Sequence, residues 1–84
     1  MITMQKLTLY HRHGCHLCDE MLEDLNRLKR QWHFEIRVVD VDADEELRRR
    51  YNDKVPVLEA NGRELCRYFL EKEKISDLMK GNAS

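Results

Sequence analysis

One apolar stripe, set between two strand-like runs, constrains the fold of this chain more than any other feature. Its members recur every three or four positions, as on one face of a helix: Leu17, Met21, Leu25, Leu28 and Trp32. The run from Leu7 to His11 before it and the β-branched run from Phe34 to Val41 after it have the character of strands. This order predicts a parallel pair joined by a right-handed crossover, with the second strand covered on both faces.

A short helix is expected after the second strand. Asp42, followed by Glu45 at capping-box spacing, has the pattern of a helix N-cap and its partner. The helix would cover residues 43 to 51, and Asn52-Asp53 would end it.

Asn61-Gly62 is the strongest local signal in the rest of the chain. The pair stands between the runs Val55–Leu58 and Glu64–Phe69, and Asn-Gly in such a place predicts an antiparallel hairpin. A closing helix ended by Gly81 is then indicated by four apolar positions: Leu70, Ile75, Leu78 and Met79. The predicted order is β-α-β-α-β-β-α, an α/β domain with a four-stranded mixed sheet and three helices.

The length and charge of the chain exclude several classes of protein. At 84 residues the chain can bury one core, so residues 1–84 are expected to form a single domain. Lys and Arg number 15 against 16 Asp and Glu, which gives a formal net charge of -1 and no broad basic surface for nucleic acid. The run Arg48–Arg50 follows three acidic residues, and we expect it to be a solvated helix face.

From the sequence we expect neither a targeting segment nor a membrane span. The opening Met1–Lys6 is polar, and no stretch approaches the roughly 18 apolar residues that a spanning helix needs. We therefore expect a soluble, cytoplasmic monomer that has no membrane partner.

The three cysteines direct attention to one short motif. They are too few for a disulfide scaffold, and in a reducing compartment a close C-x-x-C pair is more often catalytic or metal-binding than structural. Cys66 lies far along the chain on a predicted strand, where a free cysteine commonly serves as a small buried hydrophobe. The chemistry is therefore sought at Cys15 and Cys18.

Cys15-His16-Leu17-Cys18 stands where the first strand gives way to the first helix. The unpaired N–H groups and the positive dipole end of a helix N-terminus favour a thiolate, so Cys15 is expected to have a lowered pKa and to act as the nucleophile. Cys18, one turn further along, is placed to face inward and to resolve a mixed disulfide. His16 is a candidate substrate-binding residue, whose proton would also favour the thiolate.

A metal site is the alternative reading of the same segment. His11, His13 and His16 crowd the two cysteines, and together they have the ligand types of a Cys2His2 zinc site. No second C-x-x-C or H-x-x-x-H follows, and ligands so close together would need a tight loop to converge. Asp19 stands where a c-type haem site needs histidine. We expect neither a bound metal nor another cofactor.

At this point the chain resembles the thioredoxin superfamily in its minimal glutaredoxin form. The resemblance rests on the C-x-x-C after the first strand, the order of elements, and Val55-Pro56 at the start of the third strand. It covers about residues 7 to 80. The segment Gly14-Cys15-His16-Leu17-Cys18 is most similar to a glutaredoxin-like family of small bacterial proteins that carry a G-C-x-L-C motif.

The resemblance implies a role for each residue of the site. Cys15 would be the attacking thiol and Cys18 the resolving thiol, with Pro56 as a cis-proline facing them. The backbone of Val55 would hydrogen-bond the substrate strand or the cysteine of glutathione. The implied activity is thiol–disulfide exchange with protein disulfides or low-molecular-weight thiols such as glutathione. Two other readings are a binding or scaffold module that makes no use of the thiols, and an edge-strand role for Pro56.

The chain also departs from the family pattern. His16-Leu17 replaces the Pro-Tyr of most glutaredoxins and the Gly-Pro of thioredoxins, so neither group indicates its redox potential. The glycine pair that follows the fourth strand in glutathione-using glutaredoxins is missing, because Leu65–Phe69 occupies that region.

Overall fold

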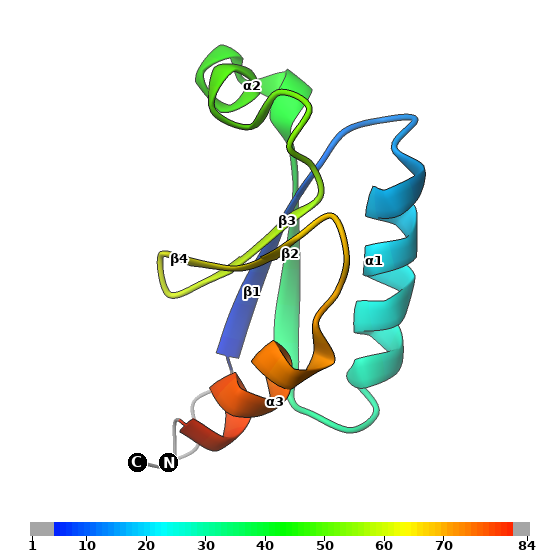
Figure 1. Ribbon diagram of the computed structural model, residues 1–84, viewed down its shortest axis with the longest axis vertical. Coiled ribbons are helices and arrows are strands. Elements are labelled where there is room, and N and C mark those ends of the chain that lie inside the picture. Colours follow the sequence, from blue (N-terminus) through cyan, green and yellow to red (C-terminus); the bar gives the residue numbers. More distant parts are fainter. Residues whose placement is uncertain (1–4, 82–84) are drawn as a thin grey trace.

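The computed structural model describes residues 5–81 (Figure 1). Its elements are β1 (Gln5–His11), α1 (His16–Leu28), β2 (Phe34–Asp40), a 3-10 turn η1 (Val41–Ala43), α2 (Glu45–Tyr51), β3 (Val57–Ala60), β4 (Arg63–Arg67) and α3 (Lys72–Gly81). The predicted order of strands and helices is confirmed, with η1 as an addition. Most of the opening segment Met1–Lys6 lies outside the described residues, as does the chain after Gly81, so the expected end of the last helix stays a prediction.

The four strands form one mixed sheet in the order β2-β1-β3-β4. β1 and β2 are parallel, as the strand-helix-strand pattern predicts, whereas β3 is antiparallel to both β1 and β4. Leu9 of β1 pairs with Val38 of β2 on one side and with Leu58 of β3 on the other.

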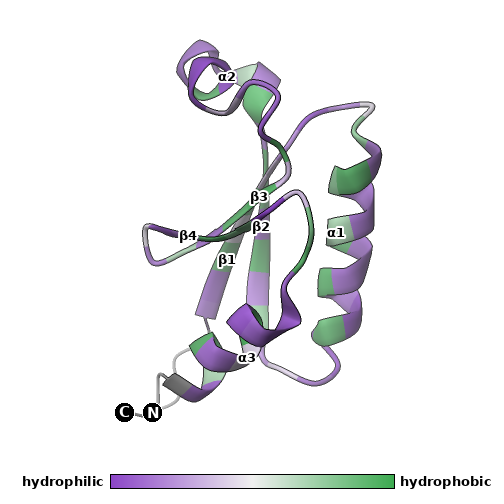
Figure 2. Ribbon diagram, in the orientation of Figure 1, coloured by the Kyte–Doolittle hydropathy of each residue, from purple (hydrophilic) through white to green (hydrophobic). Residues whose placement is uncertain are grey.

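The main core lies between one face of this sheet and the two helices α1 and α3. Its buried members come from all of these elements: Leu7, Leu9, Met21, Leu25, Phe34, Leu58, Ala60, Cys66 and Ile75. Figure 2 shows the hydrophobic side of α1 turned toward the sheet. The apolar stripe identified in the sequence is therefore the packing face of α1.

The opposite face of the sheet is polar along much of its length. Thr8 pairs with Arg37 on β2 and with Glu59 on β3, so these three residues form a row across the sheet. The expectation that β2 is covered on both faces was wrong. β2 is an edge strand, and its Glu35 and Arg37, on the face opposite the core, are exposed.

Helix α1 is shorter than its apolar stripe suggested. It ends at Leu28 with Lys29 as its C-cap, and Trp32 lies in the turn that follows. The Trp32 N–H still donates to the Leu28 carbonyl at 2.9 Å, and Trp32 packs against the main core. The turn keeps the helical spacing while the chain reverses toward β2.

The N-cap of α2 is Asp44, so the prediction of Asp42 at that place was wrong. One carboxylate oxygen of Asp44 accepts from the N–H groups of Glu46 at 2.8 Å and Leu47 at 3.4 Å. Asp40 caps η1 in the same manner, by accepting from the Asp42 N–H at 2.9 Å. The extra turn of η1 moves the start of α2 along the chain, and this leaves the Asp42 side chain available for another partner.

The hairpin turn and the end of α2 agree with the sequence analysis, but β3 begins at Val57 instead of Val55, and β4 ends at Arg67 instead of Phe69. Asn61 and Gly62 both have positive φ, 54° and 77°, as a two-residue turn of this kind requires. Asn52 is the C-cap of α2, with φ at 40°. Arg48–Arg50 are exposed on that helix. Among residues 5–81, no helix has the length and apolar character needed to cross a membrane.

Candidate functional site

Cys15 is the N-cap of α1. Its backbone is extended, with φ at -93° and ψ at 105°, and its Sγ accepts a hydrogen bond from the Cys18 N–H at 3.1 Å. This sulfur takes the part that a serine or aspartate oxygen usually plays at a helix start. Gly14 directly before it has a φ of 77°, a conformation that glycine adopts without a steric penalty, and so turns the chain from β1 into the helix.

Cys15 and Cys18 are joined by a disulfide, and their Cα atoms are 5.2 Å apart. Cys15 is partly exposed, whereas Cys18 is only 2% exposed. The predicted asymmetry of the two positions is therefore present. Cys15 is thus the more exposed of the two residues, and Cys18 is bonded to it from the buried side.

A second, smaller apolar cluster lies beneath the two cysteines. Its buried members are Cys18, Val41, Tyr51, Val55 and Val57, with Tyr10, Cys15 and Leu47 packed against them. The cluster brings together the start of α1, the end of α2 and the segment that leads into β3. Residues far apart in the sequence thus meet under the motif.

The Val55–Pro56 peptide bond is cis, as the family resemblance implied. Both residues are buried, and Val55 shares the small cluster with Cys15 and Cys18. The Pro56 carbonyl accepts from the Tyr68 N–H at 2.8 Å, which ties this segment to the loop after β4. The structure therefore brings together four of the five predicted site residues, namely Cys15, Cys18, Val55 and Pro56.

The fifth, His16, lies on the solvent side of α1. Its side chain is 86% exposed, and its Nε2 is 3.2 Å from Glu20 Oε1. His13 has the same exposure, and its Nε2 is 3.5 Å from Asp40 Oδ2. Each histidine thus has a carboxylate partner. Neither histidine is paired with Cys15, whose Sγ contacts the Cys18 N–H at the start of α1.

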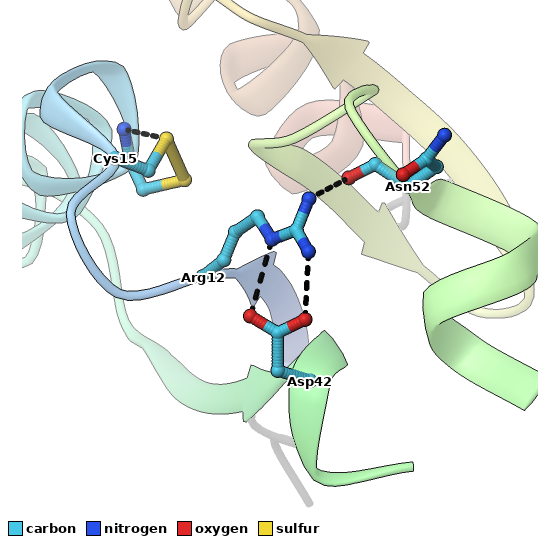
Figure 3. The surroundings of a disulfide bond; sticks show 5 residues. Arg12, Cys15, Asp42 and Asn52 are labelled. Atoms are coloured by element: carbon cyan, nitrogen blue, oxygen red, sulfur yellow. Dashed lines mark hydrogen bonds and ion pairs between the residues drawn. A yellow bond between two sulfur atoms is a disulfide. The ribbon is translucent and has the colours of Figure 1, made fainter. Parts of the chain in front are cut away.

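Arg12 joins the loop before the motif to two other segments (Figure 3). Its Nε and Nη2 donate to the two carboxylate oxygens of Asp42 at 3.1 and 2.8 Å, and its Nη1 donates to the Asn52 carbonyl at 3.0 Å. The hydrogen bonds from Arg12 lower the pKa of Asp42, and the carboxylate raises the pKa of Arg12. The sequence analysis assigned no role to Arg12, because its partner Asp42 had been taken for a helix cap.

Two stacked tyrosines belong to the small cluster next to Cys18, and the sequence analysis did not predict them. The rings of Tyr10 and Tyr51 stack with their centroids 4.4 Å apart and their planes at 23°. The Tyr10 hydroxyl donates to Glu59 at 3.5 Å, and burial, followed by its tyrosine and glutamate neighbours, raises the pKa of Tyr10. The stack holds α2 against β1 below the cysteines.

The residues around the motif do not converge on a metal. No group of three or more His, Cys, Asp or Glu side chains within residues 5–81 is arranged to hold an ion. His11 and His13 meet edge to face at 6.0 Å between ring centroids.

Cys66 lies apart from the site. It is a free cysteine on β4, 3% exposed, and belongs to the main core beneath α1 and α3. Burial raises the pKa of its thiol, so the reactive thiolate is disfavoured there.

Comparison with solved structures identifies close relatives of this arrangement. Protein Ne2328 from Nitrosomonas europaea is 43% identical, with a TM-score of 0.84, and the match covers 94% of this chain and 95% of that one. Protein XcR50 from X. campestris is 32% identical, with a TM-score of 0.71, and the match covers 89% and 96%. Thioredoxin 1 from Thermosipho africanus, at 16% identity, a TM-score of 0.65 and coverage of 94% and 99%, shows that the fold is thioredoxin-like.

The comparison with curated proteins finds no match. The model of one family, described as "Glutaredoxin-like domain (DUF836)", matches residues 6–80. These residues include the cysteine pair, the cis-proline and nearly all of the described fold. The chain therefore belongs to the glutaredoxin-like domain family (DUF836).

Proposed function

We propose that this protein is a thiol–disulfide oxidoreductase whose Cys15–Cys18 pair alternates between a dithiol and a disulfide. The observation that carries the proposal is the hydrogen bond from the Cys18 N–H to Cys15 Sγ at 3.1 Å, on a partly exposed helix N-cap. In the reduced protein the same contact and the helix end stabilise a negative charge on that sulfur. A thiolate is the form that attacks disulfides.

The reaction follows from the unequal exposure of the two sulfurs. The Cys15 thiolate attacks one sulfur of the substrate disulfide, forms a mixed disulfide and releases the other substrate sulfur as a thiolate. Cys18 then attacks Cys15, which closes the protein disulfide and releases the second substrate thiol. Two electrons pass from the protein to the substrate, so no further cofactor is required.

The substrates we propose are disulfides of proteins or of low-molecular-weight thiols such as glutathione. The buried Val55-Pro56 segment beside the cysteines is where the substrate backbone would lie. A reducing compartment such as the cytoplasm fits this role, since it supplies the thiols that return the pair to its reduced state.

Trapping of the intermediate tests the proposal. The reduced Cys18→Ser and Cys15→Ser variants are incubated with glutathione disulfide and with a model peptide disulfide, and the adducts are located by mass spectrometry. We expect Cys18→Ser to retain one mixed disulfide on Cys15, and Cys15→Ser to capture nothing. The wild-type protein should release substrate thiols and end as the intramolecular disulfide.

Two results would contradict this assignment. Adducts that form on Cys18 as readily as on Cys15 would show that Cys15 is not the preferred attacking thiol. A reduced wild-type protein that leaves every disulfide intact would favour a binding or scaffold module that keeps the fold without using the thiols.

A further inference from the structure

Two consecutive aromatic residues lie exposed in the loop between β4 and α3. Phe69 is 67% exposed and Tyr68 38%, and the one other large apolar side chain with comparable exposure in residues 5–81 is Val38. Single exposed apolar residues are ordinary on protein surfaces. Adjacent aromatic residues are more informative, because exposed apolar patches often mark binding sites.

The backbone of this loop is held in an unusual conformation. Tyr68 has a φ of 68°, a left-handed region that is sterically unfavourable for a bulky residue. Two hydrogen bonds maintain it, from the Tyr68 N–H to the Pro56 carbonyl at 2.8 Å and from the Phe69 N–H to the Arg67 carbonyl at 2.7 Å. Backbone strain of this kind is concentrated at ligand sites and clamps.

The aromatic pair is continuous with the candidate site. Tyr68 bonds Pro56, and the neighbouring Val55 packs in the same cluster as Cys15 and Cys18. Figure 1 shows the loop after β4 passing beside the start of β3 on its way to α3. Val55 makes no backbone–backbone hydrogen bond to another described residue, and the proposed function places the substrate backbone at this segment.

We propose that Tyr68 and Phe69 form an aromatic shelf that selects polypeptide disulfides in which an apolar side chain flanks the reacting cysteine. This inference rests on the proposed function and specifies its substrate class. An apolar side chain that packs on the two rings loses its contact with water, and this favours the complex. Glutathione disulfide gains little from the same surface, because its glutamyl and glycyl ends are charged and carry no apolar side chain.

The shelf acts on the first step of the exchange. It holds the substrate cysteine against Cys15 while the thiolate attacks one substrate sulfur and the other leaves as a thiolate. Cys18 then completes the protein disulfide, and two electrons and two protons have moved from the dithiol to the substrate thiols. The shelf residues take no part in the bond changes, so they alter substrate preference without altering the intrinsic reactivity of Cys15.

The test measures the second-order rate constant of the reduced protein with three disulfides. Two are symmetrical peptide disulfides that differ only in Phe or Ser beside the cysteine, and the third is glutathione disulfide. The variants are Phe69→Ser and Tyr68→Gly, and both keep the backbone N–H of residue 68 that bonds the Pro56 carbonyl. Val38→Ser is the matched control, because it removes an exposed apolar side chain from the distant edge strand β2.

We expect Phe69→Ser and Tyr68→Gly each to lower the rate constant for the Phe peptide at least about fivefold, as the loss of part of one aromatic contact implies. The rate constants of these two variants for the Ser peptide and glutathione disulfide should stay within about twofold of wild type. The rate constants of Val38→Ser for all three disulfides should stay within the same range. An equal loss for all three disulfides, or no loss for the Phe peptide, would overturn the shelf while leaving the redox function in place.

Sedimentation of the same samples tests whether a second copy of this protein, instead of a substrate, covers Tyr68 and Phe69. A dimer that dissociates in Phe69→Ser, with unchanged substrate preference, would assign the aromatic pair to self-association and overturn the proposal. A wild-type protein inert toward all three disulfides would overturn both this inference and the proposed function.

Discussion

Arg12 binds Asp42 through two nitrogens, at 3.1 and 2.8 Å, and thereby fastens the loop before Cys15 to the turn after β2 (Figure 3). A third donor, Nη1, bonds the Asn52 carbonyl at the end of α2 at 3.0 Å. One planar side chain thus joins three segments that meet only in the folded protein. Bidentate geometry of this kind fixes orientation as well as distance.

Replacing Arg12 should therefore release the loop before Cys15 from its two contacts. We expect Arg12→Gln to lower the melting temperature and to slow the attack of Cys15 on a model disulfide, because the loop that positions the N-cap loses its anchor. Arg49→Gln is the matched control, since Arg49 pairs with Glu45 at 3.4 Å within a single exposed helix. Equal effects of the two substitutions on the melting temperature and rate would show that Arg12 is only another surface charge.

The same ion pair predicts an acid-dependent part of the stability. The hydrogen bonds from Arg12 lower the pKa of Asp42 from its ordinary value of 3.8. A carboxylate whose pKa is lower in the folded state contributes stability above its unfolded pKa and loses it as the pH falls through the folded pKa. Denaturant unfolding should therefore show wild type more stable than Asp42→Asn at neutral pH, with the gap closing below about pH 4. A gap independent of pH from 7 to 2 would contradict this origin.

Cys66 should be dispensable for disulfide exchange. Its thiol is buried in the main core and burial raises its pKa, so iodoacetamide should label Cys15 in the reduced native protein and reach Cys66 only after unfolding. Cys66→Ala should keep the exchange rate near that of wild type and cost about 1 kcal/mol of stability, as a typical core substitution does. A large loss of activity in a folded Cys66→Ala protein would reveal a third redox position.

Because Tyr68 has a left-handed backbone, glycine should stabilise the protein more than alanine at this position, the reverse of their usual order in a helix. At a φ of 68°, Tyr68→Gly should be more stable than Tyr68→Ala by about 1 kcal/mol, because glycine has no Cβ to clash. At the exposed Glu23 in the middle of α1, the order should reverse, with alanine favoured by about 1 kcal/mol. Thermal unfolding of the four variants measures both differences. Alanine favoured at both positions would contradict the strain at Tyr68.

Most of the fold could be predicted from local pattern. The stripe from Leu17 to Leu28 is the buried face of α1, and Asn61-Gly62 is the turn of the hairpin. These features depend on neighbours in the sequence, so periodicity and turn chemistry are enough to find them. The exposure of β2 was missed, because whether a strand lies at the centre or the edge depends on which strands pair beside it.

The candidate site, like the fold, could be predicted from the sequence only in part. The placement of Cys15 at a helix start and of Cys18 inside it follows from the sequence around them, and the cis form of Val55–Pro56 followed from the family resemblance. The assignment of Asp42 failed because Asp40, Asp42 and Asp44 all have the chemistry of a cap, and local pattern does not choose among them.

The sequence by itself determined the order of the elements, the placement of the cysteine pair at the start of α1 and the turn that closes the hairpin. Each depends on backbone preferences and side-chain spacing within a few residues. Only the tertiary structure decided that Arg12 reaches Asp42, that Tyr10 stacks on Tyr51, and that Tyr68 bonds Pro56. These contacts join residues from separate elements, and they form only after the sheet order and the helix positions have brought those elements together.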